Sequence, residues 1–368
     1  SDAASSVLLQ TGTTTGWVMS KQANTASTFN VGYVTIDGTN TQSITFNGAT
    51  LTGAITNNAS LILGEDVVWN SGATVSNNGT LQINKGTGDL VLNNIVDVNA
   101  GTYKRAVVTN TAAGNLIIVN TGNKSLSGDI TISNGGKVTL KGGTFGTADA
   151  AITNNIAAEN STTLVLDGVV TYLNKAGSVD QILDINTELT NGSVMHMLAD
   201  DRLNWGGAYT TTVGLNSLLD VGSTRQSLSG NALKLAGGTI YGTGGTYPTG
   251  NYTAGLDYHA SGTITVTENS LIATAVASRD AADVVTLDVA ANKTLTIGSY
   301  TAGETTNTGS FVGAGKFDKT GDGTVLYKGS AFTNTLDIKA GVFEYYVEDE
   351  RTHTGRITDS GTTSGDTT

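Results

Sequence analysis

Cysteine is absent from this chain of 368 residues, and proline occurs only once, at Pro248. Without cysteine the chain can form neither disulfides nor thiolate metal sites. Cysteine-free chains suit export in an unfolded state, although many cytosolic proteins also lack disulfides. At the average usage of ~5%, a chain of this length has roughly eighteen prolines. Because proline cannot donate to a strand ladder, its near-absence favours strand pairing along most of the chain.

Charged residues are also scarce, and basic residues are the scarcer kind. Charged residues make up 14% of the chain, with 19 Lys and Arg against 31 Asp and Glu, which gives a formal net charge of −12. Proteins that bind phosphate backbones need clustered Lys and Arg. We therefore expect no nucleic-acid partner.

Long hydrophobic runs are absent as well. None approaches the ~18 consecutive apolar residues that a membrane-spanning helix needs, so we expect no transmembrane segment in this chain. The first residues, Ser1-Asp2-Ala3-Ala4, lack the basic and apolar regions of a signal peptide. We expect that such a peptide has been removed or was never present.

The chain is rich in Gly, with 48 residues, and in Thr, Asn and Ser. This mixture supplies tight turns and polar-faced strands. Disordered chains share it, but a hydrophobic fraction of 38% and regular alternation argue against disorder. Short runs in which Leu, Ile or Val alternates with a polar residue predict strands with one buried face. They include Thr80–Ile83, Ile130–Ile132, Lys137–Leu140, Thr163–Leu166, Thr263–Val266 and Thr294–Ile297.

The predicted strands, between residues 30 and 346, repeat at two distances. Neighbouring strands lie about 8 to 10 residues apart, and equivalent apolar positions such as Ile118 and Leu140 lie about 22 apart. A parallel β-solenoid with two or three strands per coil explains both distances. β-Sandwiches also give strands every ~8–12 residues, but sandwiches in series normally show linkers and proline-bearing edge strands. We therefore expect an all-β fold, a single parallel β-helix over residues 1–310 and beyond.

Turn residues and interruptions complete the predicted fold. Pairs such as Asn191-Gly192 suit turn positions with positive φ. Residues Val179–Leu189 and Met195–Leu203 have room for a short helical turn each. A few projecting loops are expected where the alternation is interrupted. These are residues 142–161, 174–220 and 241–260.

A specific motif occurs near the C-terminal end, in residues 312–326 and 336–343. It resembles the passenger-associated repeat of autotransporters, which reads approximately G-x-G-x-L-x-K-x-G-x-G-T-L, a gap, then T-x-V-x-x-G-x-L. Its fixed positions are occupied by Gly313, Gly315, Lys319, Gly321, Gly323, Thr324 and Gly341, and its apolar slots by Phe317, Val325, Ile338 and Phe343.

This resemblance implies a right-handed parallel β-helix that is secreted or displayed at a bacterial surface, outside the outer membrane. It also implies that residues 311–346 are repeat coils that continue the helix and help nucleate folding during export. Residues 347–368 are then a flexible tail or a link to a missing region. No translocator β-barrel follows within the chain, so the resemblance places one in a missing flank or implies another export route.

Parallel β-helices also include polysaccharide hydrolases and lyases, so a pair of acids in this chain is a candidate for catalysis. Asp200 and Asp201 are adjacent, and they lie close in sequence to His196 and Trp205. An enzyme would use the acids and His196 for proton transfer and Trp205 to stack on a sugar. The alternative is a polar loop with an anchoring Trp.

Other chemistry is not indicated by the sequence. A lyase needs a basic residue beside cation-binding acids, and Lys and Arg are scattered. The three His residues, His196, His259 and His353, lack metal-ligand spacing. We therefore expect no metal, no cofactor and no catalytic residue, with a polysaccharide-degrading enzyme as the alternative.

Tyrosines gather in one predicted loop, at Tyr241, Tyr247, Tyr252 and Tyr258. Tyr offers a broad amphipathic contact surface at low entropic cost, so this loop, with Trp205, is expected to bind a glycan or a host or cell-surface protein. The alternative is that the rings lie flat on the solenoid.

The function we expect is that of a non-catalytic β-helical passenger or stalk that acts in adhesion or ligand binding at the bacterial cell surface. A spacer without a ligand is a further alternative. Open coil ends expose unpaired strand edges, so a cap or a neighbouring domain is expected at each end.

Overall fold

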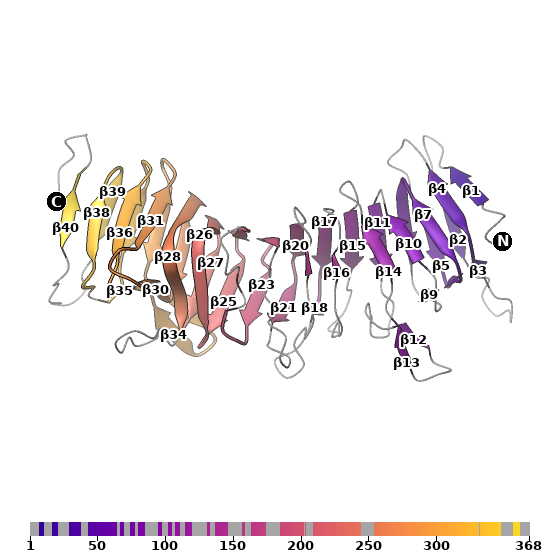
Figure 1. The fold of residues 1–368 in the computed structure, drawn as a ribbon, viewed down its shortest axis with the longest axis horizontal. Helices are drawn as coiled ribbons and strands as arrows, with labels where there is room; N and C mark the ends of the chain where they lie inside the picture. Colours follow the sequence, from indigo (N-terminus) through magenta and orange to yellow (C-terminus); the bar gives the residue numbers. More distant parts are fainter. Residues whose placement is uncertain are drawn as a thin grey trace. The chain divides into compact units, whose positions relative to one another are not determined.

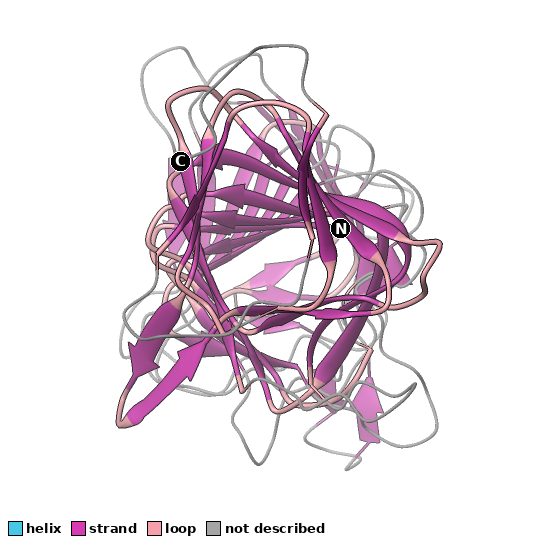
Figure 2. Ribbon diagram, turned by 90° about the vertical axis from the view of Figure 1, so that its left-hand side faces the viewer, coloured by secondary structure: helices cyan, strands magenta, loops and turns pink. Residues whose placement is uncertain are grey.

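In a computed structural model, most of the residues that can be described lie in parallel strands. The described residues are 7–10, 17–20, 29–37, 43–64, 67–69, 74–77, 80–84, 95–97, 102–104, 107–110, 115–119, 131–132, 137–145, 157–158, 163–173, 185–201, 203, 209–243, 254–330, 332–346 and 356–360. They contain strands and no helix (Figure 2). Accordingly, no helix suited to crossing a membrane occurs among them. The chain forms two compact units, residues 1–171 (unit 1) and residues 172–368 (unit 2).

Unit 1 is a parallel β-solenoid whose first coils contribute one strand to each of three sheets (Figure 1). Sheet 1A contains β1 (Val7–Gln10), β4 (Val34–Asp37), β7 (Ala54–Asn57), β10 (Thr74–Asn77) and β14 (Val107–Asn110). Sheet 1B contains β2 (Trp17–Ser20), β5 (Ile44–Asn47), β8 (Ser60–Leu63), β11 (Thr80–Asn84), β15 (Asn115–Val119), β17 (Lys137–Lys141) and β20 (Thr163–Asp167). Sheet 1C contains β3 (Asn30–Val31), β6 (Thr50–Leu51) and β9 (Val68–Trp69).

The remaining strands of unit 1 form small pairs. The strands β12 (Ile95–Asp97) and β13 (Thr102–Lys104) are antiparallel, whereas β16 (Thr131–Ile132) pairs in parallel with β19 (Ala157–Ala158). In the same way β18 (Thr144–Phe145) pairs with the start of β21 (Val170–Leu173).

Unit 2 is also a three-sided parallel solenoid. Sheet 2A contains the first halves of β26 (Arg225–Ala236) and β28 (Gly255–Glu268), followed by β30 (Ala275–Ser278) and β35 (Ser310–Gly313). Sheet 2B contains β22 (Asn186–Thr190), β24 (Thr211–Gly214), the second halves of β26 and β28, β31 (Val284–Val289), β36 (Lys316–Thr320), β38 (Thr335–Ile338) and β40 (Ile357–Asp359). Sheet 2C contains β23 (Val194–Met197), β25 (Leu218–Gly222), β27 (Thr239–Gly242), β29 (Ser270–Ala273), β32 (Thr294–Ile297), β37 (Thr324–Tyr327) and β39 (Val342–Tyr345). An antiparallel hairpin of β33 (Ser299–Ala302) and β34 (Thr305–Thr308) interrupts one coil.

Alternation within each strand explains why these sequences form a solenoid. In sheet 2B, one inward position carries an aliphatic residue in five successive coils, and each of these residues is fully buried. The five are Leu189, Val213, Leu235, Val266 and Val289. Burying one such side chain contributes about 1.5–3 kcal/mol, and each coil shields the next from water.

The predicted parallel solenoid is thus confirmed, and so are its alternating strands. Ile118 and Leu140, which share the predicted spacing, are register partners in neighbouring coils. The predicted turn at Asn191-Gly192 is also confirmed, with φ values of 54° and 75°. Such left-handed conformations favour Asn and Gly over other residues.

The predicted loops were wrong where the structure describes them. Residues 174–220 contain the strands β22 to β24 and the start of β25. Of the short helical turns expected there, residues 186–189 and 195–197 are strand and residues 199–201 are a bend. Residues 241–260 contain the start of β28, and residues 142–161 contain β18 and β19. Polar Thr187 and Thr211 occupy inward positions of these strands, and apolar Val194 and Leu218 occupy outward ones, which weakens the alternation. Within the predicted tail, 347–368, β40 pairs in parallel with β38.

The inward column of sheet 2B leads to a stability prediction. Leu235→Ala should lower the free energy of unfolding by about 2–5 kcal/mol, because it leaves a cavity between two coils. Thr265→Ala, on the outward side of the next coil, should change it by less than about 0.5 kcal/mol. Urea denaturation followed by circular dichroism measures both values. Equal losses would contradict the assignment of inward and outward faces.

Candidate functional site

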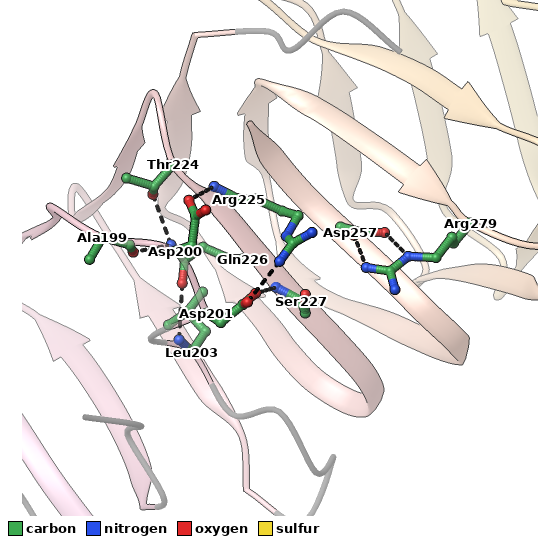
Figure 3. A network of polar contacts seen from close by, with 10 residues as sticks. All are labelled: Ala199, Asp200, Asp201, Leu203, Thr224, Arg225, Gln226, Ser227, Asp257 and Arg279. Carbon is green, nitrogen blue, oxygen red and sulfur yellow. Dashed lines mark hydrogen bonds and ion pairs between the residues drawn. The ribbon is translucent and has the colours of Figure 1, made fainter. Parts of the chain in front are cut away.

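The adjacent acids Asp200 and Asp201 lie in the bend after β23 and bond to the start of β26 in the next coil (Figure 3). Asp200 Oδ1 accepts a hydrogen bond from the Arg225 backbone N–H at 2.8 Å. Asp201 accepts from the Ser227 backbone N–H at 3.1 Å and from Arg225 Nη2 at 2.9 Å. Asp201 has a left-handed backbone, with a φ of 55°. The two carboxylates therefore join one coil to the next.

The protonation of Asp201 follows from these contacts. Burial alone would raise the pKa of its carboxyl, but hydrogen bonds from Ser227 and Arg225 and the charge of Arg225 outweigh burial and hold the pKa below its usual value. Asp201 is thus ionised at neutral pH. A general acid in glycoside hydrolysis needs the opposite shift, a raised pKa.

Gln226 is fully buried and contacts the backbone on both sides of the acid pair, at Ala199 and Leu203. Its Nε2 donates to the carbonyl of Ala199 at 2.9 Å and to Thr224 Oγ1 at 2.8 Å, and its Oε1 accepts from the backbone N–H of Leu203 at 3.0 Å. Buried amides are normally satisfied in this way. Gln226 therefore fixes the bend that carries Asp200 and Asp201.

A second ion pair extends the network along sheet 2A. Asp257, in β28, is buried with 1% of its surface exposed, and Arg279 reaches it from the next coil (Figure 3). Arg279 Nε donates to Asp257 Oδ1 at 3.1 Å, and Arg279 Nη2 donates to Asp257 Oδ2. The hydrogen bonds with Asp257 raise the pKa of Arg279 against the opposing effect of burial. This two-pronged geometry is typical of strong Arg–carboxylate pairs.

His196 does not join the two acids. It lies in β23, where its Nδ1 is 2.7 Å from Asp220 Oδ2 in the adjacent strand β25. The Tyr172 ring stacks on its imidazole, with centroids 4.6 Å apart. His196 therefore contacts Asp220, whereas Asp200 and Asp201 contact β26, so the three residues do not form one catalytic group.

Of the four tyrosines in the predicted loop, two lie in strands of the solenoid and two lie outside the described residues. Tyr258 is completely buried in β28, and Tyr241 in β27 is 7% exposed. The Tyr241 hydroxyl donates to the carbonyl of Thr305 at 3.2 Å, and its ring contacts Tyr300 of the β33–β34 hairpin. Both side chains belong to the solenoid and are not presented to a ligand. Tyr247, Tyr252 and Trp205 lie outside the described residues, as does His353.

Lys319, the lysine of the repeat motif, points into the solenoid. It is the register partner of buried Leu287 and is itself 0% exposed. Its Nζ donates to the carbonyls of Thr320 at 2.6 Å, Gly321 at 2.7 Å and Ala340 at 3.1 Å. Burial lowers the pKa of Lys319 to about 8. The ammonium group thus ties β36 to the turn of the following coil.

Two glycines of the motif make room for this lysine. Gly321 and Gly341 have φ values of 70° and 74°, which disfavour other residues. A Cβ on Gly341 would lie 2.4 Å from the carbonyl oxygen of Gly321 and 2.7 Å from Lys319 Nζ. The other motif residues lie at strand ends or beside them. Gly313 ends β35, Gly315 precedes β36, and Gly323 precedes Thr324, which begins β37.

An aromatic cluster, which the sequence analysis did not identify, fills the core beside the motif. Phe311 stacks on Phe317 with centroids 4.2 Å apart, and Tyr327 lies 4.9 Å from Phe311. Phe332, Phe343 and Tyr345 also belong to the cluster. Phe311, Phe317 and Tyr327 lie in the consecutive strands β35, β36 and β37, and Phe343 lies one coil later in β39, whereas Phe332 lies outside the strands. The recurrence of aromatic residues in successive strands is the signal that would have revealed them.

The described part of the chain has no group of three or more His, Cys, Asp or Glu side chains that could hold a metal ion. No family model matches the sequence, and neither the curated proteins nor the solved structures include a significant match.

The buried ion pair leads to a prediction. Arg279→Met leaves the Asp257 carboxylate buried without its counter-ion and should destabilise the protein by on the order of 2 kcal/mol or more. Lys293→Met is the matched control, because Lys293 pairs with Glu268, whose side chain is 55% exposed. That change should lower stability by less than about 1 kcal/mol. Chemical denaturation compares the two, and equal losses would contradict the structural role of Asp257.

Lys319 leads to a prediction about pH. Its pKa is about 8 in the folded chain and 10.5 ordinarily, so the unfolded chain binds more protons between these values. The contribution of Lys319 to the free energy of unfolding should therefore increase as pH rises from 8 to 10.5. The stability difference between the wild type and Lys319→Met should widen over that range, measured by urea denaturation. Lys319→Gln serves as a second variant, and a pH-independent difference for both would contradict the prediction.

Proposed function

We propose that this chain is a non-catalytic β-solenoid of the autotransporter passenger type, secreted or displayed at a bacterial surface, where it acts in adhesion. The observation that carries this proposal is the motif around Lys319. Its lysine donates hydrogen bonds to backbone carbonyls of its own coil and of the next coil, and its glycines leave room for this close approach. The motif is therefore part of the architecture that the resemblance implies.

The contacts of the acid pair support a non-catalytic role. Asp200 and Asp201 accept hydrogen bonds from β26, and the lowered pKa of Asp201 suits a permanently charged acceptor. The nearest histidine in sequence, His196, pairs with Asp220 instead. These residues thus have structural partners that account for their positions.

For ligand binding we propose Tyr247, Tyr252 and Trp205 as the contact residues, because Tyr241 and Tyr258 are part of the solenoid core. Tyr and Trp rings stack well on the apolar faces of sugars and on protein surfaces. A cell-surface glycan is the ligand class that this composition favours, and the chain's excess of acidic residues argues for a neutral or basic partner.

A glycan array tests this function. Wild-type protein should bind a defined set of glycans, and Tyr247→Ala and Tyr252→Ala should each weaken binding by about tenfold or more, as expected for the loss of an aromatic anchor. Tyr346→Ala is the matched control, since Tyr346 is 52% exposed elsewhere and its loss should leave binding unchanged.

Two outcomes would contradict the proposal. Unchanged binding by both loop variants would remove the tyrosines from the ligand site. Polysaccharide cleavage by the wild type that Asp201→Asn abolishes would assign the chain to the enzymes instead.

A further inference from the structure

Lys319 is the only Lys or Arg with a fully buried side chain among the described residues, and its nitrogen is surrounded by backbone oxygens. Its Nζ donates to three carbonyls, those of Thr320 and Gly321 in its own coil and that of Ala340 in the next. An ammonium group has three N–H donors and no acceptor. The number of carbonyls therefore matches the number of protons that a primary ammonium ion presents.

The charge around this site also suits a cation. Burial lowers the pKa of Lys319 to about 8, and the charges of Asp288 and Asp322 oppose that effect. The amine is therefore mainly protonated at neutral pH. Backbone carbonyls bind cations by replacing the water that would otherwise surround them. The three carbonyls thus have the composition of a cation-binding site.

The positions of these carbonyls are set by the backbone and not by the lysine side chain. The strands β36 and β38 pair in parallel, and the carbonyl of Lys319 itself accepts from the backbone N–H of Lys339 at 2.9 Å. Gly321 and Gly341 hold the left-handed backbone of the two turns, with φ values of 70° and 74°. A shorter side chain at position 319 should therefore leave the three oxygens in place.

The alkyl stem of Lys319 has aliphatic neighbours. Its register partners are Leu287 in the preceding coil, which is 0% exposed, and Ile338 in the following coil. A ligand that takes the place of the lysine must therefore join an apolar chain to a primary ammonium group. The n-propylammonium ion has both parts, because its three carbons and its nitrogen correspond to the atoms that Lys319→Ala removes.

We propose that the carbonyls of Thr320, Gly321 and Ala340 form a binding site for primary ammonium ions. Lys319 occupies this site in the intact chain, and a free alkylammonium ion occupies it when that side chain is shortened. Recognition depends on three N–H donors at the end of an apolar chain and not on charge alone. This inference concerns the core of the solenoid and does not rest on the proposed adhesive function.

Urea denaturation of Lys319→Ala at neutral pH tests the proposal, with n-propylammonium chloride and tetramethylammonium chloride compared at equal concentration. Both ions carry one positive charge, but only n-propylammonium has N–H donors. Because n-propylammonium should bind the folded variant alone, its presence at ten times its Kd should raise the folded-to-unfolded ratio about elevenfold over that in tetramethylammonium. The wild type, whose site is filled by Lys319, should show no difference between the two salts.

Two variants serve as matched controls, and neither should recover stability in n-propylammonium. Lys319→Met fills the same space with an apolar side chain, and Lys293→Ala removes a lysine that pairs with the exposed Glu268. Equal recovery of Lys319→Ala in the two salts, recovery of either control, or no recovery of a folded Lys319→Ala would overturn the proposal.

A measurement on the wild type decides the matter where Lys319→Ala does not fold in either salt. NMR of the protein with nitrogen-15-labelled lysine should show one ammonium signal whose protons exchange slowly with water, because all three are hydrogen-bonded in the core. The side chain that gives this signal should show cross-peaks to Leu287, its register partner. Lysines at the surface should lose their signals through rapid exchange. Rapid exchange at Lys319 as well would overturn the proposal.

Discussion

Parallel register between coils is the constraint on which the rest of this structure depends. Each residue of a strand has a neighbour at the same height and on the same face one coil later, as Leu235 has Val266. An inward position is therefore apolar in most coils, with Lys319 as an exception whose ammonium group is satisfied by backbone carbonyls. An outward charge lies next to another side chain of the same column. The scarcity of proline has the same origin, because nearly every strand donates its backbone N–H groups to a neighbouring coil.

The stacking of successive coils also explains why opposite charges recur one coil apart. Asp201 pairs with Arg225, and Asp257 pairs with Arg279. Two further pairs, Glu268 with Lys293 and Asp318 with Lys339, follow the same rule. Where the acid is buried, as in Asp257, the pair determines which coil stacks on which, since any other register would leave a buried charge without its partner. An acid cluster in such a fold thus has a structural explanation before a catalytic one.

The sequence predicted the strands well where aliphatic alternation was uninterrupted, as at Lys137–Leu140 and Thr263–Val266. It failed at residues 186–197, because polar Thr187 lies on the inward face and apolar Val194 on the outward face. It located Asp200 and Asp201 but not their partners. Coil lengths vary, as the β33–β34 hairpin between β32 and β35 illustrates, so the residue that faces a given acid cannot be found from a fixed spacing.

The motif around Lys319 was found in the sequence because its requirements are local and concern the backbone. An inward lysine needs carbonyl acceptors, and the close approach of the next turn requires glycine at Gly341. These requirements do not depend on any ligand. A motif of this kind therefore indicates the fold of the chain and does not indicate what the chain binds. In the proposed adhesive function, ligand specificity resides in side chains that project from the coils, where register places no restriction on them.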